Sequence, residues 1–285
     1  MRLVVMRFPK GRKKAVTLSY DDGVKTDERL IRIMNDHGLK GTFNINGGLF
    51  RSEEETDVKP TSRMTYQEAK EVYLQSGQEV ALHGLRHGFF SYMSNPVANL
   101  EVCEDRRMLE EMTGEIVCGM AYPFGSYSEQ FLDVLRMNGV AYARTTRSHF
   151  QFHLPEEFLT WHPTCHHKYD KLEELTDAFL TEKTGYGKRD CMLFYLWGHS
   201  YEFETDNNWD VIERFAEKMG NREDIWYATN MEIYRYVKAY EQLEFNVAQT
   251  CVYNPTAIDL WVEVPNWREE GAPAICIPAG QMVRL

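Results

Sequence analysis

The 285-residue sequence contains no long apolar run, no closely spaced cysteine pair and no excess of basic residues. A transmembrane helix needs about 20 consecutive apolar residues, and a secretory signal needs an apolar core that residues 1–15 lack. The six cysteines are scattered without Cys-x-x-Cys spacing, which is typical of reduced thiols rather than of a disulfide framework. These absences predict a soluble, cytoplasmic protein that has no membrane partner.

Acidic residues outnumber basic ones by 43 to 32, and the formal net charge is −11. Nucleic acids and anionic membranes both attract positively charged surfaces, so this balance argues against either partner. The first apolar, β-branched run is not followed by a phosphate loop or by Gly-x-Gly-x-x-Gly, so a nucleotide-binding sheet is not supported. The hydrophobic content of 43% is that of a globular protein with a sizeable core.

Strand-like and helix-like segments alternate along most of the chain, with a period of roughly 30 to 45 residues that is typical of parallel βαβ units. The length fits an α/β fold built on a distorted (β/α) barrel of seven or eight parallel strands. We expect residues 1–240 to form this barrel domain. Residues 241–285 alternate apolar with polar residues and contain Pro and Gly, which predicts a small β-rich C-terminal extension.

The hydrophobic periodicity and the helix start and stop signals place the individual elements. Residues 146–168 are expected to be irregular. The predicted strands are 16–21, 41–46, 79–82, 116–121, 140–145, 191–197 and 225–229, and the predicted helices are 26–37, 65–77, 95–113, 128–138, 171–183, 209–219 and 232–240.

Two adjacent carboxylates end the first predicted strand, in the sequence Asp21-Asp22-Gly23. Adjacent side chains of an extended chain point to opposite sides, so one acid could hold a metal ion while the other, redirected by the turn at Gly23, faces a water molecule. The alternative is an ordinary Asp-Asp-Gly turn without chemistry.

Two histidines, His83 and His87, follow the strand at residues 79–82. Their spacing allows both imidazoles to reach one ion, although two unrelated histidines would give the same pattern. Together with Asp22 they would form a three-ligand set that leaves positions open for water and substrate, as in catalytic zinc sites. Iron, cobalt and nickel accept the same donors.

Further polar residues follow other strands. His199 comes after Gly198 at the end of the strand at 191–197, and Tyr122-Pro123-Phe124 follows the strand at 116–121. The latter segment could direct backbone N–H groups at an oxyanion, or it could be a plain strand-to-helix turn. In a (β/α) barrel the active site lies at the carboxyl ends of the strands, which is where all of these residues are expected.

With these residues, the chain resembles the polysaccharide deacetylase family (carbohydrate esterase family four) over most of residues 15–230. Asp21-Asp22-Gly23 is similar to the family's first motif and His83-Gly84-Leu85-Arg86-His87 to its second. The resemblance implies that Asp21 is the catalytic base. It also implies that Asp22, His83 and His87 bind one divalent metal ion, zinc first and cobalt, nickel or iron as alternatives.

The later motifs are less complete. Pro123-Phe124-Gly125 is similar to the end of the third motif and implies that the Phe124 amide binds the oxyanion, with Tyr122 beside it at the substrate. Leu196-Trp197-Gly198-His199 resembles the last motif and implies that His199 is the general acid. A cationic His199 needs a carboxylate partner, for which Glu202, Glu204 and Asp206 are near in sequence.

Two departures from the family pattern stand out. The arginine of the third motif is replaced by Ala121, so the group that orients the catalytic aspartate must come from elsewhere, with Arg144 and Arg147 as candidates. No Asp-Trp pair matching the fourth motif is visible.

The function predicted from the sequence is therefore metal-dependent hydrolysis of an N-acetyl or other amide-linked acyl group on an amino sugar or oligosaccharide. One alternative is an amidohydrolase of a small non-sugar amide or cyclic imide on the same fold, with or without a metal. The other is a degenerate carbohydrate-binding domain, for which Ala121 is the only indication.

Overall fold

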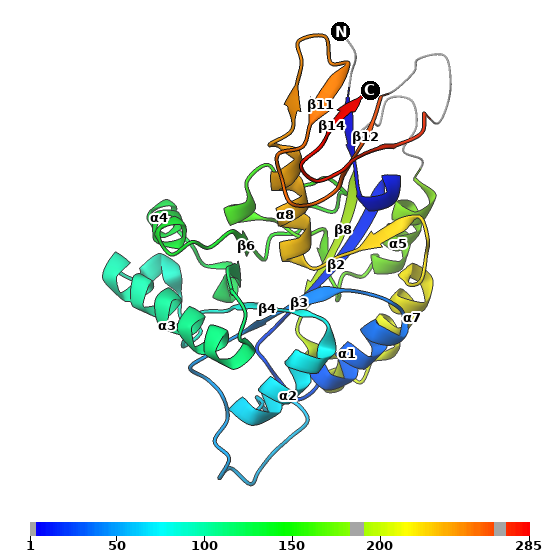
Figure 1. The fold of residues 1–285 in the computed structure, drawn as a ribbon. Coiled ribbons are helices and arrows are strands. Elements are labelled where there is room, and N and C mark those ends of the chain that lie inside the picture. The colour runs from blue at the N-terminus through cyan, green and yellow to red at the C-terminus, as the bar shows by residue number, and fades with distance from the viewer. Residues whose placement is uncertain (1–3, 183–190, 265–271) are drawn as a thin grey trace.

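The computed structural model describes residues 4–182, 191–264 and 272–285. Its centre is an eight-stranded sheet in which β6, β5, β4, β3, β2, β8 and β7 follow one another, with β9 also paired to β2 (Figure 1). All of these pairings are parallel. The strands are β2 (Lys14–Asp21), β3 (Gly41–Ile45), β4 (Glu79–Leu82), β5 (Gly119–Ala121), β6 (Tyr142–Arg144), β7 (Cys165–His166), β8 (Met192–Gly198) and β9 (Ile225–Tyr227). The predicted α/β class with parallel strands is confirmed.

The sheet curls into a distorted, partly closed barrel. At one edge, Trp161 donates its backbone N–H to Ala143 of β6, 3.0 Å away. A few residues later, Thr164 donates to Tyr195 of β8, 2.9 Å away. The segment from Trp161 to β7 therefore connects the two edges of the sheet.

Helices cover the outside of this sheet (Figure 1). They are α1 (Asp27–Asp36), α2 (Tyr66–Ser76), α3 (Asn95–Thr113), α4 (Glu129–Met137), α5 (Leu172–Thr181), α6 (Ser200–Thr205), α7 (Asp210–Met219) and α8 (Asn230–Tyr240). Local signals fix several ends. The capping box of α2 is formed by Thr65 and Glu68, and Gly77, with a φ of 70°, ends that helix in the left-handed conformation.

Strand β2 forms the middle of the core. All eight of its residues are buried, and it pairs with β8 along one edge and with β9 and then β3 along the other. The residues before the two aspartates are either apolar or small and polar, which suits a strand that is buried on both faces. Because β2 is held along both edges, its carboxyl end is a rigid platform for Asp21.

Small antiparallel sheets form the predicted β-rich extension, and β11, β12 and β14 gather at one end of the molecule beyond α8 (Figure 1). The extension strands are β10 (Glu244–Phe245), β11 (Cys251–Tyr253), β12 (Leu260–Glu263), β13 (Ile275–Ile277) and β14 (Met282–Arg284). The unexpected β1 (Val5–Arg7) pairs with β12, and Arg7 bonds Glu263 over 2.8 Å. Both ends of the chain thus build this part, and the domain boundary at residue 240 stays a prediction.

Other short elements also lie outside the expected set. The two-residue strand β7 lies within the segment expected to be irregular, and the six-residue helix α6 follows directly after His199. Elements this short contain too few residues for a hydrophobic period to be recognised. The end of the helix expected at 171–183 reaches residues outside the described part.

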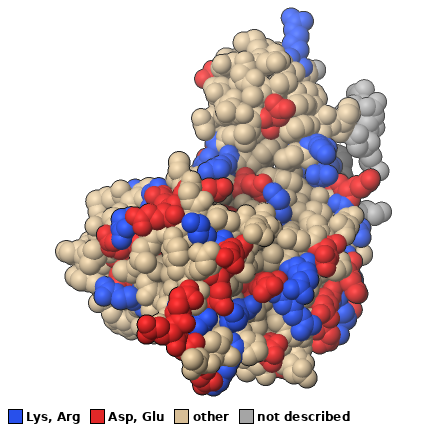
Figure 2. Space-filling model, turned by 60° about the horizontal axis from the view of Figure 1, so that its bottom comes forward, with Lys and Arg blue, Asp and Glu red and all other residues tan. Residues whose placement is uncertain are grey.

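The surface carries both signs of charge. Figure 2 shows basic and acidic side chains interspersed over the lower part of the molecule. Among the described helices, none is both long enough and apolar enough to span a lipid bilayer. The six cysteines, all of which lie in the described residues, form no disulfide bond.

Candidate active site

The polar residues that follow β2, β4 and β8 meet at one rim of the sheet. Because parallel strands end on the same side, their C-terminal residues converge there. The Nε2 atom of His83 and the Nε2 atom of His199 each lie 3.9 Å from Oδ2 of Asp21. The clustering of these side chains, expected from their positions after strands, is observed.

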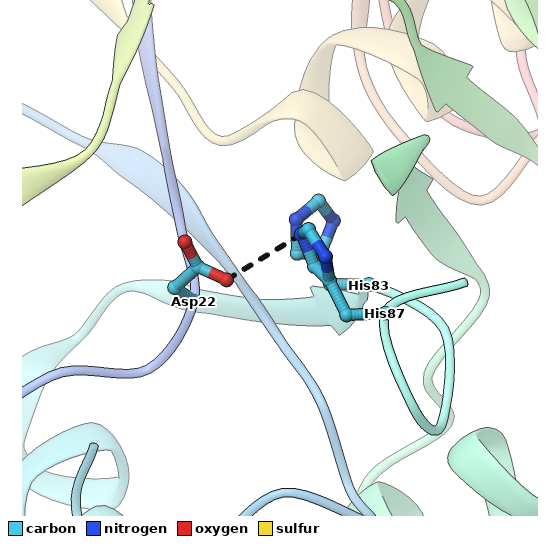
Figure 3. Close-up of side chains that lie close together, drawn as sticks. All are labelled: Asp22, His83 and His87. Atoms are coloured by element: carbon cyan, nitrogen blue, oxygen red, sulfur yellow. Dashed lines mark ion pairs between the residues drawn. The ribbon is translucent and has the colours of Figure 1, made fainter. Parts of the chain in front are cut away.

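Asp22, His83 and His87 form a candidate metal centre in which the three potential ligand atoms lie within 4.8 Å of one another. Figure 3 shows the Asp22 carboxylate facing the two imidazoles, and Nε2 of His87 lies 3.6 Å from Oδ1 of Asp22. Two imidazoles and one carboxylate match the donor set of catalytic zinc sites. These residues therefore fit the divalent ion that the sequence implies.

The backbone around these ligands adopts unusual conformations. Asp22 has a φ of 87° and His87 a φ of 53°, both in the left-handed region, and each costs about 1–3 kcal/mol. At Asp22 this conformation breaks the strand alternation, so that both carboxylates reach the same side: Oδ2 of Asp22 lies 4.0 Å from Nε2 of His199, which also faces Asp21. The redirection predicted for the Asp-Asp-Gly turn is thus visible in the backbone.

The environment keeps both histidines of the candidate metal centre uncharged. Burial lowers the pKa of His83, and burial together with the neighbouring His83 lowers the pKa of His87 to about 4. Nδ1 of His83 lies 2.9 Å from the carbonyl oxygen of Ala121, and when the ring donates from this nitrogen, the Nε2 lone pair faces the site. Neutral imidazoles with a free lone pair are what a metal ligand requires.

Asp21 is held as a buried anion. It is 2% exposed, and Arg144, which is 0% exposed, donates from Nη2 to its Oδ2, while Nδ2 of Asn44 donates to Oδ1 over 2.9 Å. Burial alone would raise the pKa of Asp21, but Arg144, followed by His83 and His199, brings it below the ordinary value. Asp21 is therefore ionised at neutral pH, as a general base must be.

Of the two arginines suggested to replace the missing third-motif arginine, the structure selects Arg144. Arg147 is exposed. Arg144 is the cross-strand partner of Ala121 in the β5–β6 register, so the guanidinium comes from the neighbouring strand. The Trp197 ring lies 4.3 Å from the Arg144 guanidinium and holds it from the other side.

His199 has one nitrogen facing the aspartates and the other bonded to Glu202. Its Nδ1 lies 3.1 Å from Oε2 of Glu202. Burial lowers the pKa of His199, but the hydrogen bond with Glu202 and the charge of Asp21 outweigh burial, and the net shift is upward. Among the three acids near it in sequence, Glu202 is therefore the partner, since Glu204 accepts from Trp209 and Asp206 pairs with Lys168.

The two aromatic residues of the Tyr122-Pro123-Phe124 segment point in different directions. Phe124, with a φ of 57°, lies at the rim with its ring centroid 4.5 Å from that of His87 and 4.0 Å from that of Phe89. Tyr122 is fully buried and donates its hydroxyl to the carbonyl oxygen of Leu159 over 2.6 Å. The structure does not bring the Tyr122 side chain to the site, because the strand alternation directs it into the core.

Sequence reasoning missed several residues that hold the ligands in place. Arg63 donates to Oδ1 of Asp22 over 2.8 Å, and Asp105 of α3 accepts the backbone N–H groups of His83, over 3.1 Å, and Gly47, over 2.6 Å. Burial raises the pKa of Asp105 to about 8. Asp105 could have been found from the sequence, because an acid on the buried face of a predicted helix indicates a polar partner in the core. Arg63 could not, because it lies in an irregular loop that has no sequence pattern.

The chain is similar to several known proteins. Residues 9–143 match the family model described as polysaccharide deacetylase. A structure from Mycobacterium smegmatis classed as a polysaccharide deacetylase is 16% identical and has a TM-score of 0.59, covering 85% of this chain and 96% of its own. The structure of Puue allantoinase is 14% identical, with a TM-score of 0.59, covering 80% of this chain and 91% of its own. No curated protein sequence matches the chain.

The structural similarities, at such low identity, show the fold alone. The family match covers the strands from β2 to the start of β6, and with them the acid pair, both histidines of the second motif and Phe124. His199 lies beyond the matched range. Residues 9–143 are therefore similar to the polysaccharide deacetylase family, whose members are hydrolases that act on carbon–nitrogen bonds, in agreement with the resemblance seen in the motifs.

Proposed function

We propose that this protein is a metal-dependent hydrolase that removes an N-acetyl or other amide-linked acyl group from an amino sugar or oligosaccharide. The observation that carries the proposal is the placement of a three-ligand cluster beside an ionised acid and a partnered imidazole. Asp21 and Asp22 both lie within 4.0 Å of His199 Nε2, while Asp22 is also part of the ligand cluster. Metal-assisted amide hydrolysis requires a general base, a general acid and a metal ion close together, and the candidate residues for all three lie at the same rim of the sheet.

Asp22, His83 and His87 would hold the ion, with zinc as the first choice and cobalt, nickel or iron as alternatives. When bound, such an ion polarises the amide carbonyl and makes a water molecule easier to deprotonate. The protein supplies the remaining steps. Arg63 and the hydrogen bond from His83 to Ala121 orient the ligands.

Asp21 takes the proton of the attacking water, because it is ionised and is fixed by Arg144 and Asn44. The water oxygen forms a bond to the acyl carbon, and the Phe124 N–H stabilises the resulting oxyanion. His199 then donates a proton from Nε2 to the leaving nitrogen as the carbon–nitrogen bond breaks. The products are the carboxylic acid and the free amine.

A second candidate is hydrolysis of a small non-sugar amide or cyclic imide. The fold is as similar to the structure named as an allantoinase as it is to the Mycobacterium smegmatis structure, with a TM-score of 0.59 for both, so the fold does not favour one activity over the other. The ion pair between Asp21 and Arg144 argues against a degenerate binding domain, since a protein that only binds carbohydrate does not need a buried, ionised base.

Substrate profiling separates these functions. Acetate release from N-acetylated amino sugars of increasing chain length is measured beside ring opening of a panel of cyclic amides, with Asp21→Asn as the matched inactive variant. We expect acetate release that disappears in Asp21→Asn while bound metal is retained. Ring opening without acetate release from any sugar would instead support the second candidate.

A further inference from the structure

A second cluster of potential metal ligands lies behind His199, on the side away from the aspartates. It consists of His166 at the end of β7, His199 and Glu202 in the first turn of α6. The potential ligand atoms of these three residues lie within 4.8 Å of one another. None of them belongs to the metal centre of the proposed function, and His166 has no part in that function.

The distances within this second cluster suit a bound ion. His166 Nε2 lies 3.2 Å, and His199 Nδ1 lies 3.1 Å, from Oε2 of Glu202. Ligands at about 2.0–2.2 Å from a tetrahedral zinc ion lie about 3.3–3.6 Å from one another. Small side-chain adjustments would therefore be enough to place an ion between them, and two imidazoles with one glutamate form a known zinc-binding donor set.

Hydrogen bonding alone does not account for the arrangement. Around the single oxygen Oε2 of Glu202 lie the backbone N–H of His199 at 3.2 Å, Nδ1 of His199, Nε2 of His166 and, at 3.3 Å, Nε2 of His167. One carboxylate oxygen has about two lone-pair sites, so these nitrogens cannot all donate to it. A ring nitrogen that does not donate directs its lone pair at a negative oxygen, which is repulsive unless a cation lies between them.

His167 provides an independent observation. Its side chain is fully buried, between the rings of Tyr20 and Phe203, and neither of its ring nitrogens makes a hydrogen bond. A buried polar group without a partner destabilises the folded state. Its Nε2 lies 3.3 Å from the same oxygen of Glu202, without the geometry of a hydrogen bond. The absence of a side chain at Gly198 permits this packing, since a Cβ there would lie 2.1 Å from Nδ1 of His167.

We propose that His166, His199 and Glu202 form a second binding site for a divalent transition-metal ion such as Zn²⁺, with His167 as a further nitrogen donor. The site is weaker than the first one, because the ion must displace the hydrogen bond between His199 and Glu202, and because the positive charge of Lys168 already lies 3.2 Å from Oε1 of the same carboxylate.

The second site bears on turnover, a consequence that rests on the proposed function. An ion on Nδ1 of His199 replaces the hydrogen bond with Glu202 that orients the imidazole toward the leaving nitrogen. Excess zinc is therefore expected to inhibit the enzyme through this site. Loss of His166 is expected to raise the zinc concentration needed for inhibition by about tenfold or more, because the removal of a group that supports a metal site typically lowers metal affinity by at least that factor.

Metal binding tests the site directly. Metal-free protein is titrated with Co²⁺ and followed by the visible absorption of the ion and by native mass spectrometry, for the wild type, His83→Ala, His166→Ala and the control His37→Gln. His37 lies at the end of α1, outside both clusters, and is expected to change neither binding step. Circular dichroism confirms that each variant is folded, and Glu202→Gln replaces His166→Ala if the latter is not.

The inference predicts that the wild type binds two ions per chain. The tightly bound ion is lost in His83→Ala, and the weakly bound ion is lost in His166→Ala. It is overturned if the wild type binds a single ion at excess Co²⁺, or if the second ion persists in His166→Ala. Acetate release with a single bound ion would refute the second site alone. Two bound ions without acetate release would refute the proposed function alone.

Discussion

Replacing Arg144 by methionine should change both the stability of the protein and the pH dependence of its activity. Arg144 and Asp21 are 0% and 2% exposed and form a direct ion pair in the barrel. Removing one partner of a buried pair costs about 3–5 kcal/mol, because the other charge stays buried without compensation. Without the guanidinium, which is the main group that holds the pKa of Asp21 below its ordinary value, burial raises that pKa.

The sign of the pH effect follows from the direction of each shift. In the wild type the folded pKa of Asp21 is depressed, so the ion pair stabilises the protein above the unfolded pKa of about 3.9 and this contribution is lost as the pH falls through the folded value. In Arg144→Met the folded pKa lies above the unfolded one, so the penalty grows as the pH rises past about 4. The stability gap between the two proteins is therefore widest near pH 8 and narrows toward pH 4.

Urea unfolding at pH 8, 6 and 4.5 measures this gap, and the acid limb of kcat/KM is expected to move to higher pH in Arg144→Met. The matched control is Arg147→Met, which removes an exposed arginine three residues away. A gap below about 1 kcal/mol, the range of an exposed ion pair, would refute the reasoning. So would a gap that does not depend on pH, or an equal effect in the control.

Three further predictions concern other parts of the site. Glu202→Gln removes the carboxylate that helps to raise the pKa of His199, so the alkaline limb of the pH–rate profile should move to lower pH; an unchanged limb would contradict the role of Glu202. Asp105→Ala removes the acceptor of the Gly47 backbone N–H and one of the two acceptors of the His83 backbone N–H, which should cost about 1–3 kcal/mol in urea unfolding and speed metal loss to a chelator. Asp21→Asn should lower kcat by about 10²- to 10⁴-fold with metal retained; metal loss in this variant would overturn the assignment of base and ligand.

The residues that sequence reasoning placed correctly are those that follow strands. Asp21, Asp22, His83 and His199 lie at or just after the carboxyl ends of β2, β4 and β8, and parallel strands must end on one side of a sheet. Their convergence is therefore a consequence of local pattern and sheet direction alone. The same logic located Phe124 at the rim.

Contacts that depend on the register between neighbouring strands could not be predicted from local sequence patterns. Arg144 reaches Asp21 only because it lies opposite Ala121 in the neighbouring strand, and the sequence could narrow the choice only to two arginines. The direction of the Tyr122 side chain depends in the same way on where β5 ends. The pairing of β1 with β12 joins residues about 250 positions apart, as in the pair Arg7 and Trp261, and no local signal predicts such a pairing.

The most direct test of the central claim is the metal content of purified, dialysed protein, measured by mass spectrometry for the wild type, His83→Ala and Asp21→Asn. The structure predicts about one tightly bound transition-metal ion per chain in the wild type and in Asp21→Asn, and none in His83→Ala, because a site that loses one of three ligands releases its ion. A wild type that stays empty after dialysis against zinc or cobalt and removal of the excess would contradict the proposed metal centre. An ion retained in His83→Ala would contradict it equally.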